Sequence, residues 1–157
     1  MTQATLSSPL ASSPPSPLVR VALGFIAAAI SVLTFHQAMW AIFFAAGAMP
    51  LAPYPMLPTK PFGVPLIWSL CFWGGLYGAV FGLVLPKLRR PYWVRGLVLG
   101  IIAALVGMFI VAPLKGQPVA AGWALLPWIR SLLINGSWGI GVGLIAPLLI
   151  RPRPTRN

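Results

Sequence analysis

The chain has 157 residues, of which 59% are hydrophobic, and it contains neither aspartate nor glutamate. Charged residues make up only 7% of it, all Lys or Arg, whereas a soluble domain carries about a quarter. Such a chain cannot cover its apolar surface with polar groups, so the surrounding medium must be lipid. The missing carboxylates exclude paired acid and base catalysis, carboxylate metal sites and acidic proton relays. We therefore expect a non-enzymatic membrane protein.

The net charge of +11 does not indicate nucleic-acid binding. The cations form no stripe with interleaved aromatic residues; they separate apolar runs, as in membrane proteins. The single cysteine, Cys71, lies inside an apolar run and excludes an intramolecular disulfide. We expect it to be a buried, inert thiol.

Residues 1–18 are rich in Ser, Pro and Thr and predict a disordered cytoplasmic tail. The region 19–150 then contains four apolar runs, each near the roughly 20 residues that a membrane-spanning helix needs. We predict an all-α, polytopic four-helix bundle. Between the spans we expect an extended proline-rich connection, a short basic loop, and a connection whose apolar piece 123–129 lies at the membrane interface. The predicted spans cover about 21–46, 64–85, 96–112 and 131–150, and a basic cytoplasmic tail covers 151–157.

The distribution of charge predicts the orientation of these spans. An even number of spans places both termini and the middle loop on one side of the membrane. That side holds eight cations, Arg20, Lys87, Arg89, Arg90, Arg95, Arg151, Arg153 and Arg156, against Lys60, Lys115 and Arg130 on the other. Because positive loops stay in the cytoplasm, we expect a multi-pass protein with both termini cytoplasmic.

The two halves of the chain share short patterns. Val19-Arg20 and Val94-Arg95 open the first and third spans, and Trp73-Gly74 and Trp138-Gly139 recur in the second and fourth. A duplicated hairpin would give two tandem αα-hairpins related by a pseudo-two-fold along the membrane normal. Chance similarity between apolar helices is the alternative.

Small residues recur at helical spacing inside three of the spans. In membranes such residues let helix backbones approach closely. We therefore predict helix packing through these glycines, either within the bundle or at a dimer face. The deeper tryptophans, Trp40, Trp73 and Trp138, are expected to pack inside the bundle in preference to contacting lipid or a pigment. The predicted packing glycines are Gly74, Gly78, Gly82, Gly96, Gly100, Gly139 and Gly143.

His36 is the only histidine and falls within the first span. Ionisable groups inside membranes are costly and often functional. Three roles are open: ligation of haem iron or chlorophyll magnesium, a hydrogen bond to a quinone, or a structural hydrogen bond to Gln37, Thr34, Ser31 or a facing carbonyl. The structural role is the commonest for such a residue.

The cations could also bind anions. On the expected cytoplasmic side Lys87, Arg89, Arg90 and Arg95 would attract anionic lipid, and on the opposite side Lys115 and Arg130 could hold an anionic headgroup or ligand. Scattered surface cations that only fix the topology are the alternative.

Several short motifs resemble a bacterial family of small integral membrane proteins with no assigned activity. They are Phe35-His36-Gln37, Trp73-Gly74-Gly75, Pro113-Leu114-Lys115-Gly116, and Asn135-Gly136 with Trp138-Gly139. The resemblance implies a location in the bacterial inner membrane and no specific site.

Three functions are compatible with these features. The first is an accessory or assembly subunit of a larger membrane complex, with lipids and other subunits, or a second copy, as partners. The second is a small anion or lipid transporter or channel, which the uniformly positive charge favours. The third is a subunit that binds haem, chlorophyll or quinone through His36.

Overall fold

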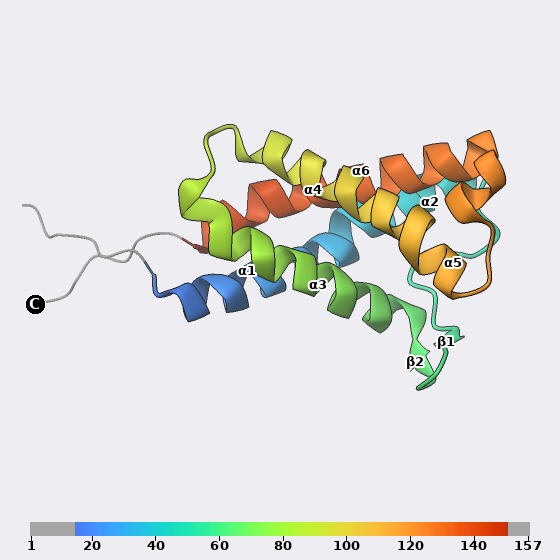
Figure 1. Cartoon of the computed structure of the whole chain (residues 1–157), viewed down its shortest axis with the longest axis horizontal. Coiled ribbons are helices and arrows are strands. Elements are labelled where there is room, and N and C mark those ends of the chain that lie inside the picture. Colours follow the sequence, from blue (N-terminus) through green and yellow to red (C-terminus); the bar gives the residue numbers. More distant parts are fainter. Residues whose placement is uncertain (1–14, 151–157) are drawn as a thin grey trace, which may run out of the picture.

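The computed structural model describes residues 15–150, and most of them lie in four long apolar helices (Figure 1). The first consists of α1 (Pro17–Ser31), a π-helical segment (Val32–His36) and α2 (Gln37–Ala45). The second is α3 (Leu66–Val84), extended by a 3-10 turn (Leu85–Lys87). The third comprises α4 (Tyr92–Val106), a π-helical segment (Gly107–Val111) and α5 (Ala112–Leu114). The fourth is α6 (Leu125–Leu149).

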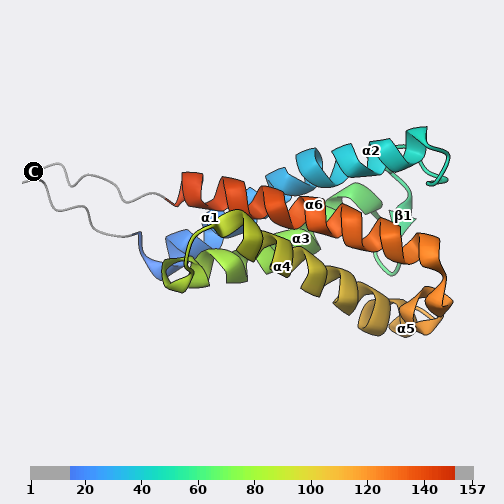
Figure 2. The ribbon, with the colours of Figure 1, turned by 90° about the horizontal axis from the view of Figure 1, so that it is seen from above.

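These helices are long enough to cross a bilayer, and helices satisfy their backbone hydrogen bonds internally where lipid offers no partner. The chain therefore has the architecture of an all-α, four-helix integral membrane protein, as its composition predicts. Figures 1 and 2 show the start of α1, the α3–α4 connection and the end of α6 at one end of the bundle. We call this the basic end and the other the strap end.

The helices begin where the sequence supplies breakers and caps. Ser16 caps α1 by accepting a hydrogen bond from the Val19 amide, and Pro17 occupies the first turn, where a missing N–H costs nothing. Pro65 and Pro91 directly precede α3 and α4. Helix α1 thus starts inside the segment 1–18 that was expected to be disordered. Residues 1–14 and 151–157, including the predicted basic tail, lie outside the described part of the chain.

The connections between the helices differ from the predicted pattern before the fourth helix. Between α2 and α3, residues 46–57, which we call the strap, precede a two-stranded antiparallel hairpin of β1 (Pro58–Thr59) and β2 (Val64–Pro65). The connection between α5 and α6, residues 115–124, contains a left-handed turn (Val119–Trp123). Because α6 begins at Leu125, most of the piece 123–129 that was expected at the membrane interface forms the start of this helix.

The bundle is built around α1 and α6. Helix α3 packs along α1, α4 packs along α6, and α1 contacts α6 in the middle. The Ser31 hydroxyl donates to the Trp138 carbonyl at 2.7 Å, and the Trp138 indole donates to the Ala28 carbonyl at 3.1 Å. Burial cannot drive association between lipid-solvated helices, so close packing and hydrogen bonds of this kind must do so.

The structure does not show the two-fold relation that a duplicated hairpin would give. Such symmetry would make the α1–α6 contact equivalent to one between α4 and α3, yet α3 and α4 touch at only a few positions. One local similarity remains, because α1 and α4 each run for 15 residues into a five-residue π-helical segment. The hairpins therefore resemble one another in part without forming a symmetric pair.

Candidate functional site

Buried polar side chains are concentrated in the first helical unit. Within the described residues, the buried polar or charged side chains are Ser31, His36 and Gln37. Ser31 belongs to the α1–α6 contact. His36 and Gln37 lie at the junction between the π-helical segment and α2, beneath the strap. This junction is the candidate site that the sequence places at His36.

Gln37 supports the irregular backbone of the strap. Its side chain is 1% exposed, and its Oε1 accepts a hydrogen bond of 2.7 Å from the backbone N–H of Tyr54. Non-helical backbone at membrane depth persists only where protein or water satisfies it. The Tyr54 hydroxyl also reaches the π-helical segment and donates to the Leu33 carbonyl at 2.8 Å. The burial of the polar Gln37 side chain therefore has a structural explanation, because this side chain fixes Tyr54 of the strap against the first helical unit.

The same hydrogen bonds fix the protonation pattern of His36. A backbone N–H can only donate, so the Gln37 oxygen must face Tyr54 and the Gln37 amide nitrogen must face His36. That nitrogen lies 3.2 Å from His36 Nδ1 and, because an amide NH₂ can only donate, Nδ1 accepts. A neutral imidazole whose Nδ1 accepts carries its proton on Nε2. The imidazole thus offers an N–H donor at Nε2, since the one hydrogen bond found for this ring among the described residues is at Nδ1.

This pattern opposes metal ligation by His36. A histidine that binds haem iron or chlorophyll magnesium donates its second ring N–H to an acceptor and uses the other nitrogen as ligand. Here the second nitrogen accepts from Gln37 instead. Among the described residues, no group of three metal-ligating side chains lies together. The arrangement is better suited to hydrogen bonding with a carbonyl oxygen.

Two further bonds anchor the strap. The Trp40 indole donates to the Leu51 carbonyl at 2.8 Å, and the Arg130 guanidinium donates to the Ala48 carbonyl at 2.8 Å. Arg130, considered from the sequence as an anion ligand, therefore joins the start of α6 to the strap. Lys115 and Lys60, the other cations at this end, are exposed.

The cations at the basic end share an exposed rim. Lys87, Arg89, Arg90 and Arg95 are all exposed, and the Arg90 guanidinium lies 5.9 Å from the centre of the Tyr92 ring. Arg90 and Tyr92 also line an open pocket of about 550 Å³ beside the end of α6. Arg20 adds a buried Nε with no hydrogen-bond partner within residues 15–150. This end of the bundle presents positive charge, and the sequence has no acidic side chain to balance it.

The glycines singled out from the sequence lie at the helix contacts. A Cβ on Gly78 or Gly82 would meet the backbone of α1 at Gly24 and Arg20. A Cβ would likewise meet the backbone of the opposite helix at the α4–α6 contact if it were added to Gly96, Gly100, Gly139 or Gly143. Gly74 faces the centre, where a Cβ would lie 3.0 Å from Val32 Cγ2 and 3.4 Å from Trp138 Nε1. Gly24 and Gly141 are equally tight but were not in the predicted set.

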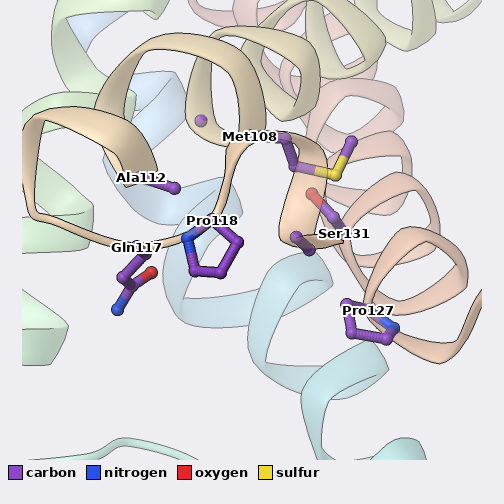
Figure 3. A pocket seen from close by; sticks show the side chains of 8 residues that line it. Met108, Ala112, Gln117, Pro118, Pro127 and Ser131 are labelled. Atoms are coloured by element: carbon purple, nitrogen blue, oxygen red, sulfur yellow. The ribbon is translucent and has the colours of Figure 1, made fainter. Parts of the chain in front are cut away.

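A second pocket, of about 430 Å³, lies beside the π-helical segment of the third helical unit. Figure 3 shows Met108 and Ala112 on one side of it, Ser131 and Pro127 of α6 on another, and Gln117 and Pro118 in the connecting loop. Its lining is mainly apolar, and Gln117 and Ser131 supply polar groups. Next to it Trp123 stacks on Trp128, with ring centres 5.7 Å apart. The pocket is thus a feature of the strap end separate from His36.

Two residues in the structure were not identified from the sequence. Tyr54 looked like one aromatic residue in a proline-rich connection, and only its contact with Gln37 reveals its role. Trp73 was expected to pack inside the bundle, but its side chain is 60% exposed. The adjacent Gly74 correctly predicted the contact face of α3. Trp73 precedes it by one position and therefore points to a different side of the helix.

No family model, characterised protein or solved structure matches this chain. The resemblance to a family of bacterial membrane proteins, and the inner-membrane location that it implies, therefore remain predictions.

Proposed function

We propose that this protein is a non-enzymatic accessory or assembly subunit of a larger complex in the bacterial inner membrane, with both termini in the cytoplasm. One observation carries the proposal: every charged side chain among the 157 residues is Lys or Arg, and no carboxylate side chain exists to balance them. The basic end concentrates this charge on an exposed rim. Counter-charges must come from other molecules, and acidic groups of neighbouring subunits, together with anionic lipid, would supply them.

The packing of the bundle also supports a structural role. Its centre is filled by Ala27, Ala28, Trp138, Val142 and Ala146, all nearly inaccessible. Glycines bring the paired helices into backbone contact on either side of this centre. A bundle packed in this way serves better as a rigid element within an assembly than as a conduit for an anion or lipid.

The test is isolation of the full chain from its native membranes in a mild detergent, followed by measurement of the particle mass. We expect a discrete particle that contains a second polypeptide in fixed stoichiometry with the 16.8 kDa chain. A monodisperse particle holding this chain alone with lipid and detergent would contradict the proposal.

A second candidate function follows from the Nε2–H of His36. A subunit of this kind could bind a quinone through a hydrogen bond from Nε2 to a quinone carbonyl. The native preparation should then contain extractable quinone that His36→Ala removes and that Thr34→Val retains. Quinone content that is unchanged in His36→Ala would exclude this role. A visible absorption band lost with His36 would instead establish a haem or chlorophyll, against the hydrogen-bond pattern described above.

A further inference from the structure

Helix α3 presents a wide apolar face away from the bundle. Its opposite face packs on α1 through buried residues that include Ile67, Cys71 and Gly78. The exposed residues follow at helical spacing from the strap end toward the basic end. They are Trp68, Phe72, Trp73, Leu76, Val80 and Leu83.

Trp73 lies near the middle of the bundle, at the level where the bilayer centre is expected. A Cβ added to the adjacent Gly74 would contact Val32 and Trp138, each one residue from the centre of its helical unit, the first and the fourth. At a rise of about 1.5 Å per residue, Val32 is roughly 18 Å from Arg20 at the basic end. Half of the hydrocarbon core is about 15 Å thick, so this level is the bilayer centre.

The indole of Trp73 is exceptional among the seven tryptophans. The indoles of Trp40, Trp128 and Trp138 donate to backbone carbonyls within the bundle. Those of Trp68, Trp93 and Trp123 have no such partner in the described residues, but they lie near helix ends, where headgroups and water accept hydrogen bonds.

Trp73 alone combines an exposed side chain, a central position and an N–H without an acceptor in the described part of the chain. Lipid tails contain no acceptor, and an unpaired donor in hydrocarbon is unfavourable. The nearest lipid acceptors are ester and phosphate oxygens about half a bilayer away. A polar side chain on another membrane protein would supply the acceptor.

We propose that the exposed face of α3 is the binding surface for a transmembrane helix of a partner subunit. This helix carries a side-chain acceptor, such as a Ser or Thr hydroxyl or an Asn or Gln carbonyl, opposite Trp73. Near its cytoplasmic end it carries a carboxylate that pairs with Lys87, the exposed cation at the end of the second helical unit. The inference rests on the proposed function and assigns its interface.

A second copy of the chain is a poorer occupant of this face. Two copies paired through α3 with the same orientation would bring Lys87, Arg89 and Arg90 of each close to those of the other. Like charges at such separation repel. A partner with acidic residues at this end removes the repulsion, and this chain has none to offer.

The test places a photo-crosslinking amino acid at Leu76, one turn from Trp73, in the full chain in native membranes. The matched control places it at Ile102, an exposed residue of α4. We expect one discrete adduct with a different polypeptide from Leu76 and only lipid adducts from Ile102. The helix captured should contain a polar acceptor near its centre.

The donor is tested by Trp73→Phe, which keeps the ring and removes the N–H. We expect the yield of the Leu76 adduct to fall about three- to tenfold, in keeping with the loss of one interhelical hydrogen bond, while Trp68→Phe leaves the yield unchanged.

Four outcomes would each overturn the inference: an unchanged adduct yield in Trp73→Phe, an adduct between two copies of this chain, lipid adducts alone, or a captured helix without an acceptor. If the complex co-purifies while Leu76 captures nothing, the interface is elsewhere and the subunit role stands. If no complex is isolated, the proposed function itself fails.

Discussion

Gln37 illustrates how a single polar residue in an apolar helix can determine the structure of a distant segment. Its amide oxygen accepts a hydrogen bond from the Tyr54 N–H, and its amide nitrogen donates one to His36. The same side chain therefore satisfies a backbone group of the strap and orients the imidazole. The sequence indicated that His36 and Gln37 are polar residues within a span. It could not show that the proline-rich strap folds back onto them, because this depends on contacts 17 residues apart.

Replacing Gln37 with Leu should destabilise the strap. The substitution leaves the Tyr54 N–H without its acceptor, and an unsatisfied buried donor costs about 1–3 kcal/mol. We expect a lower Tm in detergent and faster proteolysis at residues 46–57. Thr34→Val is the matched control, since among the described residues the Thr34 hydroxyl bonds only the Ile30 carbonyl of its own helix. Equal effects of the two substitutions would show that Gln37 does not hold the strap.

Glycine substitutions should separate contact positions from open ones. A Cβ on Gly82 or Gly139 would overlap backbone of the neighbouring helix, so Gly82→Ala and Gly139→Ala should destabilise the bundle by roughly 1–3 kcal/mol. Gly107→Ala is the control, because no neighbouring atom in the described part of the chain lies within 4 Å of its added Cβ. Thermal unfolding in detergent measures the difference. Tolerance of alanine at both contact positions would contradict the observed packing.

The elements differ in how far their positions follow from the sequence. Length and hydropathy predicted the four helical units, because a bilayer requires apolar helices of that size. Hydropathy could not predict which side of α3 faces the bundle, since this helix is apolar on every side. The glycine stripe correctly indicated the contact face of α3. Trp73 was nevertheless predicted to lie inside the bundle, and in the structure it is exposed on the outside. The π-helical segments gave no sequence signal that we identified.

The left-handed turn before α6 is strained because alanine residues occupy backbone conformations that favour glycine. Ala120 and Ala121 have φ of 53° and 54°, a region that costs an L-residue with a Cβ roughly 1–2 kcal/mol. Ala121→Gly should therefore raise the Tm, because glycine adopts this conformation without that cost. Ala124→Gly is the control: its φ of −73° and ψ of 129° suit alanine, so the substitution should lower the Tm. A drop in both variants would show that Ala121 is not strained.

The whole molecule combines an apolar helical bundle with uniformly positive charge. Its four helices give it the architecture of an integral membrane protein, and the described cations fall into two groups at opposite ends. Five of them, Arg20, Lys87, Arg89, Arg90 and Arg95, lie at the basic end. Because positively charged loops remain in the cytoplasm, this asymmetry predicts one orientation in the membrane.

The most direct test of this account is labelling of single cysteines from outside intact spheroplasts with a membrane-impermeant maleimide, in a Cys71→Ala background. Leu18→Cys places the thiol at the basic end and Gln117→Cys at the strap end, both at exposed positions. We predict immediate labelling of Gln117→Cys, and labelling of Leu18→Cys only after the membrane is disrupted. Equal labelling of both thiols in intact spheroplasts, or labelling of Leu18→Cys alone, would contradict a bundle that spans the membrane with its basic end inside the cell.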